Sequence, residues 1–254
     1  MKAHNVHLAA QLTTNAPVKR QIILNGRRCK GASHWLTAIP CRWDDTEFDA
    51  ASFRALLKYN IGFPLMNSDN KCPDCGKLQD KFGHHALSCK VASGAIDKHN
   101  SIVAGISSFL KKANIIHRVE EPNPLKRSRE RPGDIFMPCF DPYGDAYFDV
   151  SVISICAESY FKKAAKGQLE GAAIRYASKM KKYPELSTRF KPLVIESTGG
   201  WHPFSFNYLK TLAEHISSRS CSTAQDILTS ILRTCSVRLQ RHQGTMLVRR
   251  CLGL

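Results

Sequence analysis

Apolar residues recur at spacings of three and four along several segments of the chain, as they do on one face of an amphipathic helix. The first such segment begins near Glu47 and is closed by Asn60 and Gly62. The second, and the most regular, runs from Ile96 to Leu110. Further helices are predicted at about 160–183, 206–217 and 223–240.

Short runs of β-branched and aromatic residues lie between these helices and predict strands. They are Ile115–Val119, Ile135–Met137, Tyr147–Ile155 and Leu193–Ile195. The turn-forming sequence DPYGD at 141–145 joins the second run to the third, which predicts a hairpin. The order of helix, three strands, helix, strand and helix predicts a mixed α/β domain.

Residues 67–90 contain few apolar side chains, so a hydrophobic core cannot order them. They contain instead the pair Cys72 and Cys75, followed by two adjacent histidines and Cys89. Three thiolates and an imidazole at this range form a ligand set for tetrahedral zinc. The alternative is three buried cysteines beside two surface histidines, but a polar segment this short has little other means of folding. The spacing therefore predicts a structural zinc knuckle.

The histidine ligand is left open by the spacing. His84 gives an H-x-x-x-x-C arrangement with Cys89 and His85 gives H-x-x-x-C, and we favour His85. The remaining cysteines have no ligand spacing and are interpreted as buried small apolar residues. They are Cys29, Cys41, Cys139, Cys156, Cys221, Cys235 and Cys251.

The charge balance of the 254-residue chain points to a polyanionic partner. Lys and Arg number 37 against 21 Asp and Glu, which gives a formal net charge of +16. Such a surplus attracts nucleic acid first and an anionic membrane surface second. Residues 1–20 lack a continuous apolar stretch, and no later segment is apolar over the length of a bilayer. We therefore expect neither secretion nor membrane insertion, and cysteines that bind metal or stay reduced.

Two carboxylates coincide with predicted strands. Asp134 follows the sequence RPG at the start of one strand, and Asp149 lies inside the apolar sequence FDVSV of the next. A charge in an apolar strand is costly unless it is paired or binds a metal. If the strands pair, both acids can converge and hold Mg²⁺ or Mn²⁺. Alternation along the strand puts Ser151 on the face of Asp149, opposite Phe148 and Val150.

A nuclease of the PD-(D/E)xK type would carry its lysine at the position of Ser151. The candidates in this chain are Lys179 and Lys182, three residues apart on one face of the following helix. Either could orient the attacking water and neutralise charge that develops in the transition state. The alternative is that both acids are structural and that the lysines belong to a solvated helix face.

Several motifs together resemble the C-terminal region of site-specific non-LTR retrotransposon proteins that carry a restriction-like endonuclease. They are HWLTAIP at 34–40, CPDCG with FGHHALSC, Lys98-His99-Asn100, RPGD, FDVSV, KMKKY and VIESTGGW at 194–201. The resemblance covers about residues 33–201. In that family a CCHC zinc knuckle precedes a PD-(D/E)xK nuclease that nicks target DNA to prime reverse transcription. The catalytic lysine of that nuclease has moved to the helix after the second acidic strand.

The resemblance implies both a fold and individual roles. The fold would be α/β, a restriction-endonuclease-like mixed sheet flanked by helices and preceded by the zinc knuckle and a helical N-terminal segment. Asp134 and Asp149 would bind the catalytic metal, and Lys179 or Lys182 would be the migrated lysine. The implied zinc ligands are Cys72, Cys75, His85 and Cys89.

His99 and Glu196 receive weaker assignments from the same motifs. His99 could touch the scissile phosphate or the metal, or it could be a packing or surface residue of its helix. Glu196, at the end of a strand, could be a third acid or the partner of a nearby basic side chain.

Two basic segments are candidates for contact with nucleic acid. The first lies just before Asp134, where a phosphate backbone would approach the metal, and consists of Lys126, Arg127, Arg129 and Arg131. The second follows Asp226, after which the chain has no acidic residue, and contains Arg233, Arg238, Arg241, Arg249 and Arg250. This second segment could track a phosphate backbone or be a solvated helix face.

We expect four consecutive regions: an N-terminal mainly helical segment at 1–66, the zinc knuckle at 67–90, the endonuclease domain at 91–220, and a basic C-terminal helix and tail at 221–254. The only Asp-Asp pair, Asp44-Asp45, is not in a Tyr/Phe-x-Asp-Asp motif, so we expect no polymerase domain. The chain would then be a truncated element, a host gene derived from one, or a free-standing nuclease.

The expected function is that of a nuclear, metal-dependent DNA endonuclease of retrotransposon origin. It would use structural zinc and catalytic Mg²⁺ or Mn²⁺ and no small-molecule cofactor, with DNA as its partner and RNA as an alternative. A catalytically inactive, transposon-derived nucleic-acid-binding protein is the main competing function, and a zinc-stabilised protein-interaction module is a third.

Overall fold

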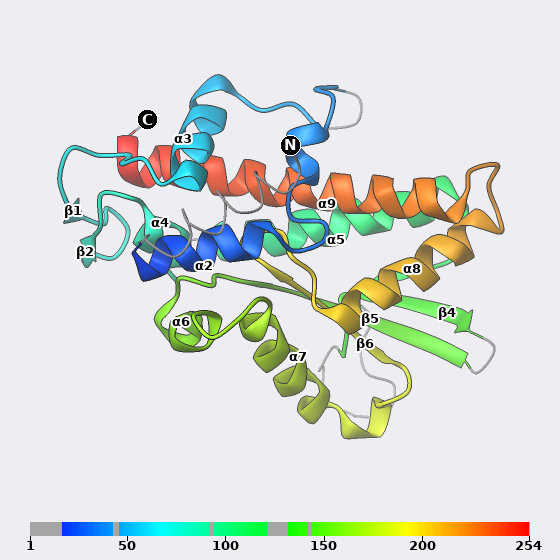
Figure 1. The fold of residues 1–254 in the computed structure, drawn as a ribbon. Coiled ribbons are helices and arrows are strands. Elements are labelled where there is room, and N and C mark those ends of the chain that lie inside the picture. The colour runs from blue at the N-terminus through cyan, green and yellow to red at the C-terminus, as the bar shows by residue number, and fades with distance from the viewer. Residues whose placement is uncertain (1–16, 43–45, 92–93, 121–131, 142–143, 254) are drawn as a thin grey trace, which may run out of the picture.

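The computed structural model describes residues 17–42, 46–91, 94–120, 132–141 and 144–253. Over these residues the chain forms a mixed α/β fold, with a small sheet between two layers of helices (Figure 1). The α/β class predicted from the sequence is confirmed at this level. The basic residues Lys126, Arg127, Arg129 and Arg131 lie outside the described part of the chain.

The main sheet has four strands in the order β3-β4-β5-β6. They are β3 (Arg118–Val119), β4 (Ile135–Asp141), β5 (Gly144–Ile153) and β6 (Phe190–Glu196). The predicted hairpin is confirmed, because β4 and β5 pair antiparallel with Ile135 opposite Phe148. Strand β6 pairs parallel to β5, with Asp149 opposite Pro192. The crossover between β5 and β6 supplies the helices of one face.

The two faces of the sheet bury different sets of helices. Helices α5 (Gly94–Lys112), α8 (Pro203–Ser217) and α9 (Ala224–Leu247) cover one face and enclose the larger core (Figure 1). Helices α6 (Glu158–Ala164) and α7 (Glu170–Lys182) cover the other. None of the described helices combines the length and the apolar character that crossing a bilayer requires.

Alternation along β5 sends successive side chains to opposite layers. Phe148 and Val150 join the core beneath α5, α8 and α9, as the sequence predicted. Tyr147 and Ile153 pack on the side of α6 and α7. Asp149, between them in this alternation, therefore faces α7.

The prediction of one continuous helix at 160–183 is wrong. Two helices form instead, α6 and α7, separated by a turn in which Leu169 has a φ of 61°. A helix cannot continue through a residue in the left-handed region. A short 3₁₀ turn, η2 (Pro184–Leu186), then leads from α7 to β6.

The N-terminal region is helical, with α2 (Val18–Arg27), a 3₁₀ turn η1 (His34–Thr37) and α3 (Ala50–Ile61). Helix α3 begins where the Asp49 carboxylate accepts a hydrogen bond from the Ser52 N–H at 2.8 Å. It ends at Gly62, whose φ of 75° is favourable for glycine. These elements pack on α9 and share a second apolar core with it.

Helix α9 is an internal element, which corrects the interpretation of the C-terminal segment as a solvated basic face or tail. Thirteen of its residues are buried, and it contacts α3, α5 and α8. A π-helical turn, η3 (Val248–Leu252), continues it. Arg250 in that turn is 2% exposed and cannot lie along a nucleic acid, whereas Arg249 remains exposed.

Candidate functional site

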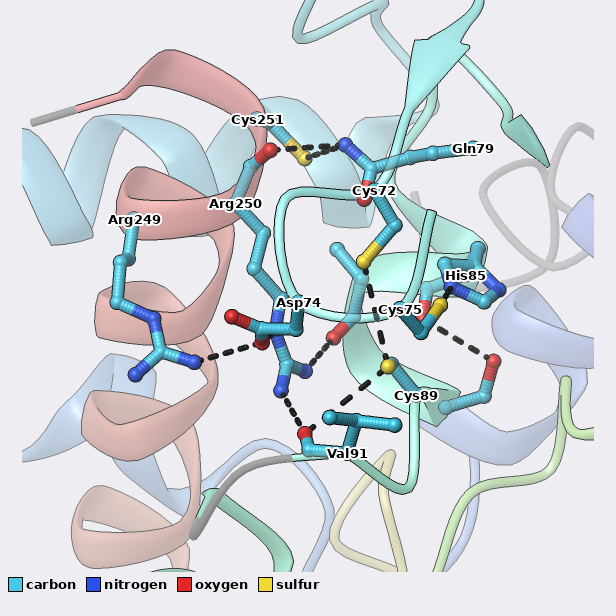
Figure 2. A network of polar contacts seen from close by, with 12 residues as sticks. Cys72, Asp74, Cys75, Gln79, His85, Cys89, Val91, Arg249, Arg250 and Cys251 are labelled. Atoms are coloured by element: carbon cyan, nitrogen blue, oxygen red, sulfur yellow. Dashed lines mark hydrogen bonds and ion pairs between the residues drawn. The ribbon is translucent and has the colours of Figure 1, made fainter. Parts of the chain in front are cut away.

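A cluster of three thiols and one imidazole forms in the segment 67–90. The ligand atoms of Cys72, Cys75, His85 and Cys89 all lie within 4.8 Å of one another. Cys75 Sγ lies 3.2 Å from His85 Nε2, and Cys72 Sγ lies 4.0 Å from Cys89 Sγ (Figure 2). This group could hold a metal ion, and its four members are those predicted from the spacing.

Local backbone geometry brings these ligands together. Strands β1 (Asn70–Lys71) and β2 (Leu78–Gln79) form a minimal hairpin, and the first two cysteines lie in the turn between them. The Asp80 carboxylate then accepts hydrogen bonds from the N–H groups of Phe82, His84 and His85, each at 3.2 Å. Such capping starts the short helix α4 (His84–Ser88), which carries the histidine toward the thiols.

The choice between the two histidines is settled by their orientation. His85 belongs to the cluster, while the ring of His84 packs 5.6 Å from the ring of Tyr59 and 6.1 Å from that of Phe82. Burial lowers the pKa of His84, as expected for an imidazole enclosed by aromatic rings. His84 is a packing residue of the knuckle.

Arg250 holds the knuckle from the C-terminal side (Figure 2). Its Nε donates to Asp74 Oδ2 at 2.6 Å, and its Nη atoms donate to the carbonyls of Ala86 and Val91. Arg249 makes a more exposed ion pair with Asp74 at 2.8 Å. We refer to Arg250, Asp74 and the two carbonyls as the arginine clamp. No sequence spacing could have revealed it, because Asp74 and Arg250 are 176 positions apart.

A second constellation lies on β5, where Asp149 meets Lys179 of α7. Lys179 Nζ is 2.8 Å from Asp149 Oδ1 and 2.7 Å from Oδ2. Asp149 is 8% exposed, and burial raises its pKa while the Lys179 ammonium opposes that shift. Both carboxylate oxygens therefore face the Lys179 ammonium in a buried ion pair.

Asp134 contacts the same strand at Val150, the residue after Asp149. Its Oδ2 accepts a hydrogen bond from the Val150 N–H at 2.6 Å. Close approach is possible because Gly133 lacks a Cβ, which would lie 2.9 Å from the Phe148 carbonyl oxygen. The charge of Asp134 contributes to raising the pKa of Asp149, so the two carboxylates interact.

His99 completes this group from α5. Its Nε2 lies 2.9 Å from Asp134 Oδ2, and its Nδ1 lies 3.0 Å from Asn100 Oδ1. The hydrogen bond to Asp134 raises the pKa of His99, with a further contribution from the charge of Asp149. His99 and Asp134 border a groove of about 280 Å³ between α5 and β3, lined also by Ser107, Lys111 and Glu120. We call Asp134, Asp149, Lys179 and His99 the acid cluster.

Two predicted site residues lie outside the acid cluster. Lys182 is exposed and stands over the ring of Tyr183, with Nζ 4.9 Å from the ring centroid. Glu196 pairs in register with Ile153 at the far end of β5 and accepts a hydrogen bond from the Ala172 N–H at 3.2 Å. Burial raises the pKa of Glu196 to about 7.

Arg175 contacts the site but was not predicted from the sequence. Its Nε donates to Ser151 Oγ at 3.4 Å, and its charge acts to lower the pKa of Asp149. The signal that could have identified it is its position four residues before Lys179, one turn earlier on the same face of α7. Helix α7 therefore brings two positive side chains, Arg175 and Lys179, to Ser151 and Asp149 of β5.

Comparison with protein-family models, with curated proteins and with solved structures finds no match to this chain. Its function is therefore inferred from the geometry of the two constellations.

Proposed function

We propose that this protein is a metal-dependent DNA endonuclease whose catalytic centre is the acid cluster. The observation that supports this most directly is the convergence of Asp134, Asp149 and Lys179 from three separate elements on one point of β5. Two carboxylates beside a cation and an imidazole are the groups needed for metal-assisted hydrolysis of a phosphodiester. In this proposal His99 contacts the scissile phosphate or the metal, and Lys182 and Glu196 take no direct part.

The acid cluster has the donor set that a hard divalent cation requires. Asp149 has two buried carboxylate oxygens, both within 2.8 Å of the Lys179 ammonium, and Asp134 lies next to it on the strand. Mg²⁺ or Mn²⁺ bound by these oxygens would polarise the phosphate and lower the pKa of a bound water. Lys179 would then orient that water and stabilise the negative charge that develops on the phosphate oxygens.

The order of elements around the site supports a restriction-endonuclease-like fold. Helix α5, the three antiparallel strands β3 to β5, the crossover helices and the parallel strand β6 follow one another in the order that the sequence pattern predicted, and they form a mixed sheet flanked by helices. The lysine that pairs with Asp149 is Lys179 on the crossover helix α7, one of the two candidates, Lys179 and Lys182, that the resemblance implied. The proposed origin from a site-specific non-LTR retrotransposon rests on this agreement and on the sequence motifs, and a nuclear location would follow from it.

We further propose that the cluster of Cys72, Cys75, His85 and Cys89 holds a structural zinc ion. Three sulfur atoms and one nitrogen match the preferred tetrahedral ligand set of zinc. Metal binding would supply the folding energy that the few apolar residues of the knuckle do not. The knuckle and the net charge of +16 would together favour binding to DNA.

A plasmid-nicking assay with Mg²⁺ or Mn²⁺ tests the catalytic proposal. Wild-type protein should convert supercoiled plasmid to the open circle, and Asp149→Asn should abolish this while DNA binding persists. Asp145→Asn, at a half-buried position next to the hairpin turn, is the matched control and should nick normally. Equal nicking by wild type and Asp149→Asn would show that the activity arises elsewhere.

A catalytically inactive nucleic-acid-binding protein is the second candidate function. It is favoured by one observation, namely that the carboxylates of the acid cluster already have partners, because Asp149 forms an ion pair with Lys179 and Asp134 lies within hydrogen-bond distance of His99. Binding of Mn²⁺ to the acid cluster distinguishes the two functions. Calorimetry should show a site that Asp149→Asn removes if the protein is an enzyme, and no such site if it only binds nucleic acid.

A further inference from the structure

An aromatic cluster joins α7 to the start of α8. The ring of Tyr176 stacks on that of His202, with centroids 4.2 Å apart and planes inclined by 17°. Phe204 stacks on Tyr176 at 5.5 Å and 27°. The hydroxyl oxygens of Tyr176 and Tyr208 are 2.9 Å apart. His202 is buried at the base of this cluster, and Phe204 is 57% exposed at its surface.

The cluster is flanked by positive charge. Lys191 Nζ lies 5.4 Å from the ring centroid of Tyr208 and donates to the Thr188 carbonyl oxygen. On the other side of α8, Lys30 and Lys210 both stand over the ring of Phe206, at 4.7 and 5.5 Å. An exposed ring on a helix whose neighbouring rings contact lysine ammonium groups is complementary to a ligand with a flat π surface and negative charge.

The position of the cluster relates it to the acid cluster. The start of α8 is fixed to β6 by three hydrogen bonds. The His202 N–H donates to the Val194 carbonyl, Ser205 Oγ donates to the Pro192 carbonyl, and Ser205 Oγ accepts from the Val194 N–H. Pro192 is the register partner of Asp149. The aromatic cluster therefore stands beside the edge strand at the level of Asp149. Tyr176 also precedes Lys179 by one turn of α7.

We propose that Phe204 and Tyr176 form a stacking platform for an unpaired base of the nucleic acid substrate, with Lys191 contacting an adjacent phosphate. This inference deepens the proposed function, because it assigns the endonuclease a substrate with a single-stranded stretch next to the cleaved bond. Stacking tolerates any base, since every base has a π face. The platform therefore confers a preference for strand state without a preference for sequence.

The protein's affinity for a short single-stranded DNA oligonucleotide, measured by fluorescence anisotropy without divalent cation, tests the platform. Phe204→Ala should weaken binding by about tenfold. Phe204→Leu should weaken it comparably, because leucine keeps the apolar bulk and loses the π face. Phe63→Ala removes a phenylalanine that is 59% exposed on the N-terminal region, and it should leave binding unchanged.

Two further measurements report on the geometry of binding. An oligonucleotide that carries 2-aminopurine should lose fluorescence on binding wild type and recover it with Phe204→Ala, since stacking quenches this base. Lys191→Ala should reduce the salt slope of binding by about one unit, the value for one phosphate contact. Unchanged affinity in Phe204→Ala, or full affinity in Phe204→Leu, would overturn the platform.

The remaining outcomes separate this inference from the catalytic one. If wild type nicks plasmid but Phe204→Ala binds single strands as well as wild type does, the platform fails and the endonuclease stands. If nicking is absent and the Phe204 dependence is observed, the catalytic proposal fails and the platform describes a binding protein. Sedimentation that shows a wild-type dimer lost in Phe204→Ala would instead make this face an interface between two copies, and the platform would be rejected.

Discussion

Lys179 and Asp149 form a buried ion pair across 30 positions of sequence, with the ammonium nitrogen within 2.8 Å of both carboxylate oxygens. The pair links the crossover helix α7 to the central strand β5. It lies at the point where two further groups, Asp134 and His99, approach the same strand. The same contact therefore stabilises the apoprotein and positions the side chain that we propose to act in catalysis.

Replacing Lys179 with alanine should affect both activity and stability. We expect a loss of nicking rate of about a hundredfold, because transition-state charge would lose its stabilising cation. The uncompensated Asp149 should also lower the free energy of unfolding by up to about 3 kcal/mol. Plasmid nicking and urea denaturation measure the two effects. Lys182→Ala is the matched control, since Lys182 is exposed beyond the acid cluster, and equal losses in both variants would contradict the assignment.

Glu196 should make folding stability depend on pH. Its pKa is raised from 4.5 to about 7 by burial, so the folded protein retains a proton that the unfolded chain releases. Stability should therefore be fully present below pH 4.5 and fall as pH rises to about 7.

Glu196→Gln tests this dependence and keeps an acceptor for the Ala172 N–H. The variant should match wild type at acidic pH and exceed its free energy of unfolding by up to about 3 kcal/mol above the raised pKa. Urea denaturation across this pH range provides the measurement. Parallel pH profiles for the two proteins would show that Glu196 is solvated or paired.

The arginine clamp should depend on Arg250 and hardly on Arg249. Arg250→Ala leaves the carbonyls of Ala86 and Val91 without their donor, at a cost of about 2–3 kcal/mol in the free energy of unfolding. Arg249→Ala removes an exposed ion pair with the same Asp74 and should cost at most about 1 kcal/mol. Chemical denaturation followed by limited proteolysis of the knuckle separates these outcomes. Similar effects in the two variants would contradict the clamp.

Zinc removal should unfold the knuckle and leave the sheet intact. Metal analysis should give one zinc ion per chain, with a loss in Cys89→Ser and none in Cys221→Ser, whose residue is exposed and not buried as the sequence predicted. Chelation should expose residues 67–90 to protease while the strands of the main sheet stay protected. Protein without stoichiometric zinc whose knuckle still resists protease would contradict a structural metal.

The basic residues that precede Asp134 in the sequence should set the salt dependence of DNA binding. Neutralising Lys126, Arg127 and Arg129 together should reduce the slope of log affinity against log salt by up to about 3 units. Binding titrations at several salt concentrations measure this slope. Arg54→Ala with Lys58→Ala, on the exposed side of α3, provides a control that should leave it unchanged. An unaltered slope in the triple variant would place the DNA surface elsewhere.

The elements predicted correctly are those whose cause is local in sequence. The hairpin follows from two β-rich runs and a turn, and the Cys and His cluster follows from ligand spacing within eighteen residues, Cys72 to Cys89. The choice between Lys179 and Lys182 depends on how α7 is rotated above the sheet. That rotation is fixed by packing, so the sequence left both residues as candidates.

The features that were not predicted depend on partners far away in the sequence or on the backbone torsion of a single residue. Helix α9 reads as a basic amphipathic segment, but three other helices and the N-terminal region surround it. The break between α6 and α7 rests on the left-handed conformation of Leu169, a residue type that does not favour it. The role of Arg250 could not be predicted because the sequence does not show that η3 packs against the knuckle.

The arginine clamp also constrains the order of events during protein synthesis. The knuckle leaves the ribosome long before Arg250 is made, because 176 positions separate Asp74 from its partner. The four proposed zinc ligands are therefore all synthesised early, but the knuckle lacks its contact with Arg250 until η3 has been synthesised. A chain truncated within α9 would lack Arg250, so its knuckle would never form the arginine clamp. We expect such chains to be degraded by cellular quality control.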